Sequence, residues 1–181
     1  MLSTFLQAPR RLAWLLFCTV SVSATASSPL GPLPNETVNP GARNHAVTQQ
    51  NIDDTICIKG WTKVVRPPLS WTNALKHKLL ARYGLPASAS RDYELDHLIP
   101  LELGGAPADP RNLWLEPWNG PWNAHIKDKL ENRLHTLVCR GEITLEDAQE
   151  AIAGNWTQAY KQFMTSRAQN NREHRRARAP S

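Results

Sequence analysis

The chain has 181 residues, of which 41% are hydrophobic and 20% are charged, with 14 prolines, 9 glycines and 3 cysteines. This composition excludes a collagen-like chain, a disulfide-dense miniprotein and a repeat protein, because glycine shows no period, cysteines are few and no internal repeat is present. The size predicts one globular domain with flexible ends. The formal net charge of +5 belongs mostly to the two ends of the chain, so any nucleic-acid-binding surface of the folded part has to be a local patch.

Residues 1–26 have the pattern of a secretory signal peptide. Two adjacent arginines precede an apolar run over residues 12–22, and small residues at 24–26 form a small-x-small cleavage pattern. The run is shorter than the roughly 20 residues that a membrane-spanning helix needs. We therefore expect cleavage after Ala26, a secreted or periplasmic location and no stable membrane association of the mature protein. An uncleaved membrane anchor is the alternative.

Two further segments flank the folded domain, which we expect over residues 52–165. Residues 27–51 are rich in Pro, Asn, Ser and Thr without apolar periodicity, which predicts a flexible N-terminal segment. Residues 166–181 hold five arginines and one glutamate and form a basic C-terminal tail. This tail is either a solvated end or a sequence-independent contact with nucleic acid. A third interpretation is that it targets the protein to anionic envelope material.

The first part of the domain is predicted to contain a short strand over residues 56–58 and then a helix. The paired prolines after Arg66 keep that residue extended, because proline disfavours the helical conformation of its predecessor. Ser70 or Thr72 can cap a helix that runs to Tyr83 and stops at the following glycine.

Two of the three cysteines, Cys57 and Cys139, would remain after removal of the signal peptide. A pair of cysteines in an exported protein predicts one disulfide bond. A redox-active or nucleophilic thiol is the alternative, although no feature around either cysteine indicates a low thiol pKa.

The middle of the chain shows strand signals and then helix signals. Residues 93–99 alternate apolar and polar side chains, and residues 113–115 form a second short apolar run, so the two can pair as antiparallel strands. Glycine and Asp-Pro turns shape the loop between them. Apolar spacing predicts a helix over residues 123–139 and another from Thr144 to about Ala153. Together these elements predict an α+β fold.

Four polar residues in this region are candidates for a functional site: Asp96, His97, Asn112 and His125. Hydrolysis of a phosphodiester needs a base that activates water and a cation that neutralises charge on the phosphate. An imidazole with its ordinary pKa near 6.5 is a suitable base near neutral pH. A carboxylate with a second imidazole can hold a divalent ion and leave positions open for phosphate and water.

The stretches that contain these residues are YELDHLIPLELGGAPADPRNLWLEP and, after it, WNAHIKDKLENRLH. They resemble the ββα-metal core of the HNH nuclease family, and in particular a group of short, exported bacterial proteins with an HNH-like domain. The core resemblance covers residues 93–133, and flanking pieces extend it to residues 56–156. It implies two short antiparallel strands and a helix, with additional helices packed around them. It also implies nuclease activity on nucleic acid, with DNA as the expected substrate.

The resemblance further implies a role for each candidate residue. His97 would be the general base that takes a proton from water, and Asn112 would brace the loop between the strands through backbone hydrogen bonds and so orient the base. Asp96 and His125 would bind one divalent metal ion. Mg²⁺ is the first expectation, and Mn²⁺, Ni²⁺ and Zn²⁺ are the alternatives, because one carboxylate and one imidazole do not select among these ions.

Three features of the sequence leave alternatives open. Asn119 and Asn123 also lie near the start of the predicted helix, and either can replace His125 as the final ligand. The paired CxxC motifs with which many relatives bind structural zinc are missing from this sequence, and the predicted disulfide would stabilise the domain instead. On a regular strand the adjacent side chains of Asp96 and His97 point to opposite faces, so they share a site only if the strand twists or ends there.

Six other residues near the proposed site are first assigned to ordinary roles. For the charged residues these roles are salt bridges or solvated positions, and for the tryptophans they are packing contacts. Contact with nucleic acid is the alternative for the lysines and the tryptophans. The six residues are Glu102, Glu116, Trp118, Trp122, Lys127 and Lys129.

The sequence therefore predicts a secreted or periplasmic, metal-dependent HNH endonuclease. The alternative function is that of a non-catalytic exported binding module that retains the HNH scaffold. This alternative is favoured by the near-neutral charge of the folded part and by the lack of an evident basic cleft in the sequence. No feature of the sequence indicates an oligomeric state.

Overall fold

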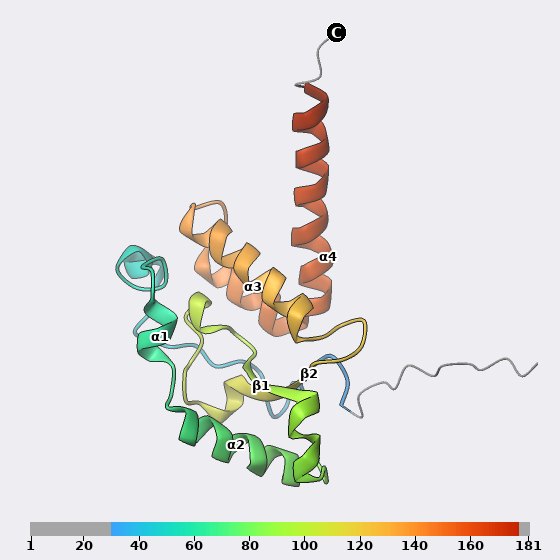
Figure 1. Ribbon diagram of the computed structural model, residues 1–181. Helices are drawn as coiled ribbons and strands as arrows, with labels where there is room; N and C mark the ends of the chain where they lie inside the picture. The colour runs from blue at the N-terminus through green and yellow to red at the C-terminus, as the bar shows by residue number, and fades with distance from the viewer. Residues whose placement is uncertain (1–29, 178–181) are drawn as a thin grey trace, which may run out of the picture.

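The computed structural model describes the backbone of residues 30–177 and the side chains of residues 30–165; the predicted signal peptide lies outside these residues. The architecture is α+β, as predicted: helices surround a two-stranded antiparallel sheet. In Figure 1 the sheet lies at the centre of the molecule, with α2 (Leu69–Arg82) on one side and with α3 (Ala124–Cys139) and α4 (Leu145–Ala177) on the other.

The two strands are β1 (Tyr93–His97) and β2 (Leu113–Pro117), and both lie close to their predicted positions. β1 is two residues shorter than expected. It ends at His97 because the N–H of Ile99 bonds to the side chain of Asn112 and does not continue the ladder. The side chain of Asn112 thus determines where the strand stops.

The register of the hairpin separates two sets of side chains. Glu94 lies opposite Glu116 in neighbouring strands, and Asp96 lies two residues after Glu94. Because side chains alternate along a strand, these three acidic residues share one face of the sheet, whereas Leu95 and His97 lie on the other. α3 covers the acidic face through the contact of Lys127 with Asp96.

α2 begins two residues earlier than a cap at Ser70 requires and four earlier than a cap at Thr72 requires. Its first residue follows Pro68, which has an extended conformation and forms no side-chain cap. Ser70 and Thr72 therefore lie inside the first turn, and the Thr72 hydroxyl donates a hydrogen bond to a backbone oxygen of that turn. Pro68 is itself the N-cap residue, and its ψ of 144° is the non-helical conformation that an N-cap takes. α2 packs on the sheet through Leu80, which contacts Tyr93 and Leu115.

α3 and α4 begin at side-chain caps and pack against each other. Asn123 Oδ1 accepts a hydrogen bond from the N–H of Ile126 at 3.2 Å, and Thr144 Oγ1, as predicted, accepts one from the N–H of Asp147 at 3.0 Å. α4 runs past Ala153, through an irregular residue at Asn155, into the segment where Trp156, Tyr160 and Phe163 were also expected to follow a helical pattern. No helix in the described part of the chain is both long enough and apolar enough to cross a membrane. The shared core includes Leu130, Leu134, Val138, Ala148, Ile152 and Trp156.

The predicted strand over residues 56–58 is not formed, because these residues make a turn after a 3₁₀ helix. The N–H of Cys57 bonds to the Ile52 carbonyl at 2.9 Å. The predicted disulfide is confirmed: Cys57 is joined to Cys139 at the end of α3, and the two cysteines are 82 residues apart in sequence. In the chain-entropy treatment, closing a loop of this length stabilises the fold by about 4.5 kcal/mol, before any native strain is subtracted.

The N-terminal segment was expected to be flexible, but from residue 30 onward it packs against the domain. Asn39 is buried, and its amide nitrogen donates hydrogen bonds to the backbone oxygens of Pro110 at 3.1 Å and Leu113 at 2.8 Å. Val47 lies in the main core. The prediction is therefore wrong for residues 30–51. Composition did not show these contacts, because several of them are hydrogen bonds to backbone groups and leave no apolar period in the sequence.

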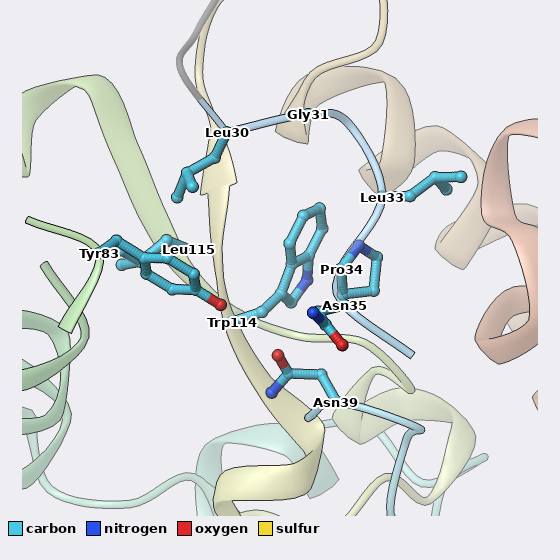
Figure 2. A pocket seen from close by; sticks show the side chains of 9 residues that line it. All are labelled: Leu30, Gly31, Leu33, Pro34, Asn35, Asn39, Tyr83, Trp114 and Leu115. Carbon is cyan, nitrogen blue, oxygen red and sulfur yellow. The ribbon is translucent and has the colours of Figure 1, made fainter. Parts of the chain in front are cut away.

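Figure 2 shows how the start of this segment lies over β2. A pocket of about 160 Å³ is lined by the segment, by β2 and by the residue after α2. Leu30 approaches Tyr83 and Leu115, and the Trp114 ring lies near Pro34. The segment thus covers part of the sheet that the helices leave open.

Candidate active site

Asn112 holds together the two ends of the loop between the strands. It is fully buried. Its oxygen accepts a hydrogen bond from the Ile99 N–H at 2.9 Å, and its nitrogen donates to the backbone oxygens of Ile99 at 2.9 Å and Ala106 at 3.2 Å. Gly105 lies against the same peptide group, where an added Cβ would be 1.8 Å from the Ile99 oxygen. The loop that follows His97 is therefore fixed by one amide side chain and by a position without a side chain.

His97 is held in a single orientation at the end of β1. Its side chain is 4% exposed, and Nε2 lies 2.9 Å from the carbonyl oxygen of Pro107. A carbonyl oxygen only accepts, so Nε2 carries the hydrogen and Nδ1 of the neutral ring keeps its lone pair. Burial lowers the pKa of His97 below its ordinary value, against the opposing effects of the Pro107 hydrogen bond and Asp96. The ring is therefore neutral near pH 7 and able to accept a proton.

His97 lines a cleft of about 420 Å³ between the α1–α2 region and β1, where α1 is Trp61–Val65. The cleft borders both faces of β1, because its lining includes Glu94 from the acidic face as well as His97 from the other. It combines three basic side chains with this one acidic group and one large aromatic ring. Burial is the main cause, and the nearby Asp96 the second, that together raise the pKa of the acidic group, Glu94, to about 7. The basic residues are Lys63, Arg66 and Lys76, and the aromatic residue is Trp118.

On the opposite face of β1, the carboxylate of Asp96 forms an ion pair with a buried lysine, Lys127. Lys127 Nζ donates hydrogen bonds to Asp96 Oδ2 at 2.6 Å and to the backbone oxygen of His97 at 3.0 Å, and it also donates to Glu131 Oε1. An ammonium has three N–H groups, so all of its donors are used. The Lys127 side chain is 0% exposed. It is therefore an internal cation and not a residue of a solvated helix face.

Burial also changes the pKa values of the carboxyl groups around Lys127. Burial raises the pKa of Glu116 to about 10 and that of Glu131 to about 8. Glu116 is then protonated near pH 7 and can donate its hydrogen bond to Asp96. Burial disfavours the charged forms of Lys127 and Asp96, but their mutual attraction outweighs it, so the pKa of Lys127 is raised and that of Asp96 is lowered. Asp96 is thus an ionised carboxylate with partners already in place.

This arrangement does not fit the predicted metal pair, Asp96 and His125. His125 is exposed, and its ring packs on Trp118 with centroids 5.0 Å apart. It precedes Lys127 by two residues, which places it roughly 200° around α3 from Lys127. The carboxylate of Asp96 forms an ion pair with Lys127. The alternative ligands do not replace His125: Asn123 caps α3, and Asn119 is exposed.

One group of side chains in residues 30–165 does have the spacing of a metal site. The ligand atoms of Cys57, His135 and Cys139 lie within 4.8 Å of one another, and no other set of three such residues does so in this part of the chain. The two sulfurs are joined in the disulfide, and His135 Nε2 lies 2.9 Å from the carbonyl oxygen of Ile56. Metal binding at this group would therefore require prior reduction of the disulfide.

The sequence contained a signal for Lys127, although it was assigned to solvent or phosphate. Lys127, Leu130 and Leu134 are spaced three and four residues apart, which is the spacing of one buried helix face. Glu131 follows Lys127 by four residues and can therefore reach it. The basic wall of the cleft had no comparable signal, because Lys63, Arg66 and Lys76 meet β1 only in the folded chain.

The chain matches no protein-family model, no curated protein and no solved structure. Its chemistry is therefore argued from its own residues. The site has two main features. A neutral His97, one ring nitrogen of which keeps its lone pair, lines a basic cleft, and the carboxylate of Asp96 bonds to Lys127.

Proposed function

We propose that this chain is an exported nuclease of the HNH type, which hydrolyses phosphodiester bonds in nucleic acid with DNA as the expected substrate. The observation that carries the proposal is the geometry of His97: one ring nitrogen is bonded to Pro107, the other is free, and the ring lines a cleft with three basic side chains. The order of two antiparallel strands and a helix supports the ββα resemblance, because His97 and Asn112 lie at the ends of the intervening loop.

In the proposed reaction, His97 Nδ1 takes a proton from water as the water oxygen attacks phosphorus. The bond from phosphorus to one sugar oxygen breaks, and that oxygen leaves with a proton from solvent. Lys63, Arg66 and Lys76 bind the phosphate and stabilise the negative charge that develops on it. Asn112 acts as a positioning residue, because it fixes the loop that carries the Pro107 carbonyl.

The divalent ion that the resemblance implies, with Mg²⁺ expected first, does not fit the contacts of Asp96. Its carboxylate bonds to the ammonium of Lys127, and His125 packs on Trp118. No step of the proposed reaction therefore passes through a metal ion. The positive charge that phosphate needs is assigned to the basic wall of the cleft.

The test is a cleavage assay on supercoiled plasmid DNA and on RNA with the full exported chain, in Mg²⁺, in Mn²⁺ and in EDTA. We expect His97→Ala to lower the rate by about 10²- to 10⁴-fold without a comparable loss of thermal stability. His77→Ala is the matched control, because His77 is an exposed histidine on α2. An inactive wild-type chain in all three conditions, or an unchanged rate in His97→Ala, would refute the proposal.

The second candidate is a non-catalytic nucleic-acid-binding module. It is favoured by the Lys127–Asp96 ion pair, which satisfies the carboxylate within the fold. This candidate predicts salt-sensitive binding of labelled DNA or RNA without cleavage, and weaker binding in Arg66→Ala. If binding occurs and no strand is cut in any of the three conditions, the binding module is the better assignment.

A further inference from the structure

The ammonium of Lys127 lies in a shell of oxygen atoms. Asp96 Oδ2 lies 2.6 Å from Nζ, the backbone oxygen of His97 lies 3.0 Å from it, and Glu131 supplies the third acceptor. Carboxylate and carbonyl oxygens are also the ligands that hard divalent cations take in proteins. The position of Nζ is thus one that a divalent ion and an ammonium would both favour.

Burial makes these two occupants mutually exclusive. Lys127 is 0% exposed, and the side chains of Asp96 and Glu131 are 18% and 13% exposed. A buried charge needs a compensating partner, and each carboxylate here already bonds to the ammonium. A metal ion on the same oxygens would lie within contact distance of a second positive charge, and water is too scarce there to screen the repulsion.

We infer that Lys127 takes the place of a divalent cation at Asp96. The wild-type chain then binds no divalent ion at this carboxylate, and removal of the ammonium turns the same oxygens into a site for Mn²⁺ or Ca²⁺. The inference concerns the composition of the site, so it holds whether or not the chain cleaves nucleic acid.

The test is Mn²⁺ binding to the full exported chain, measured by the electron paramagnetic resonance signal of free Mn²⁺ and by thermal unfolding. Five proteins are compared: wild type, Lys127→Ala, Asp96→Asn, the double variant Lys127→Ala/Asp96→Asn, and Lys129→Ala. Lys129 is the matched control because it is an exposed lysine on the same helix. None of these readouts requires enzymatic activity.

We expect Lys127→Ala to bind Mn²⁺ at least about tenfold more tightly than wild type, and its Tm to rise with Mn²⁺. The double variant loses this binding, and Lys129→Ala behaves as wild type. If Lys127→Ala is unfolded in EDTA, Mn²⁺ is expected to refold it, which circular dichroism detects.

Three results would overturn the inference. The first is Mn²⁺ binding by the wild-type chain that disappears in the single variant Asp96→Asn. The second is a folded Lys127→Ala that binds Mn²⁺ no better than wild type. The third is a Lys127→Ala chain that fails to fold even with Mn²⁺ present, because the vacated oxygens would then not accept a metal ion in place of the ammonium.

Discussion

The two faces of β1 carry neighbouring residues into opposite environments. On one face, Asp96 bonds to an ammonium that has no exposure to solvent. On the other face, His97 keeps one ring nitrogen free and lines a cleft with a basic wall. The two residues are adjacent in the same sequence motif. Asp96 nevertheless lies in a closed cluster of charges, whereas His97 borders an open cleft.

The comparison teaches that adjacency in sequence does not place two side chains in one site. Strand alternation separates Asp96 from His97, and the irregular loop that follows does not bring them back together. The closed face contributes to stability, because its charges are satisfied inside the protein. The open face is available for chemistry, because its groups have unused donors, acceptors and charges.

The largest expected effect is on the closed face. Lys127→Ala leaves the ionised Asp96 without its cation and Glu131 without its hydrogen-bond donor, so we expect a loss of about 3–5 kcal/mol in the free energy of unfolding. The measurement is urea unfolding in EDTA. The exposed control Lys129→Ala is expected to change stability by less than about 0.5 kcal/mol. Equal effects of the two substitutions would show that the closed face does not depend on its ammonium.

A smaller loss of stability is expected at the loop that joins the two faces. Asn112→Ala leaves the buried N–H and C=O of Ile99 without their side-chain partner, which costs about 2–4 kcal/mol. We expect the rate of cleavage to fall as well, because the loop positions the carbonyl that orients His97. Urea unfolding checks the first effect. Asn132→Ala is the control, since Asn132 is exposed on α3 and bonds only within its own helix.

The smallest expected effect is a change in how stability depends on pH, and it comes from Glu94. The pKa of Glu94 is about 7 in the folded chain, chiefly through burial, against an ordinary value of 4.5. Between these values the folded state keeps a proton that the unfolded state has released, so Glu94 lowers stability as pH rises through this window. Glu94→Gln removes that decline. We therefore expect this variant to gain stability relative to wild type as the pH rises from about 5 to about 8.

Thermal unfolding across that range measures the difference between the two pH profiles. The control is Glu36→Gln, an exposed residue of the N-terminal segment. Its profile is expected to run parallel to that of wild type. A parallel profile for Glu94→Gln would contradict the raised pKa of Glu94.

Local signals made the hairpin and the helices after it predictable. Alternating side chains indicated both strands, and the caps at Asn123 and Thr144 lie where the apolar stripes begin. The predicted start of α2 was wrong by a few residues, because Pro68 and not Ser70 or Thr72 occupies the N-cap position, without a side-chain hydrogen bond that a sequence rule would look for.

The site was only partly predictable because its contacts are non-local. The likeness to a nuclease motif directed attention to Asp96 and His125 as a pair, but helix periodicity turns Lys127 and Glu131 toward β1 and His125 away from it. A lysine in line with Leu130 and Leu134 was the one available clue. Its meaning depended on the carboxylates of another element, which the sequence of the helix does not contain.

The packing of the N-terminal segment, residues 30–51, against the domain affects any protein or tag that is attached at that end. The indole nitrogen of Trp156 donates a hydrogen bond to the Pro32 oxygen at 2.7 Å, so the contacts with the domain begin close to the start of the described residues. If the leader is cut after Ala26, only residues 27–31 separate the new terminus from this contact. A reporter or surface tether fused there would be joined by a short linker and would lie close to the pocket that Leu30 and Trp114 line. Attachment at the far tip of α4 avoids that interference.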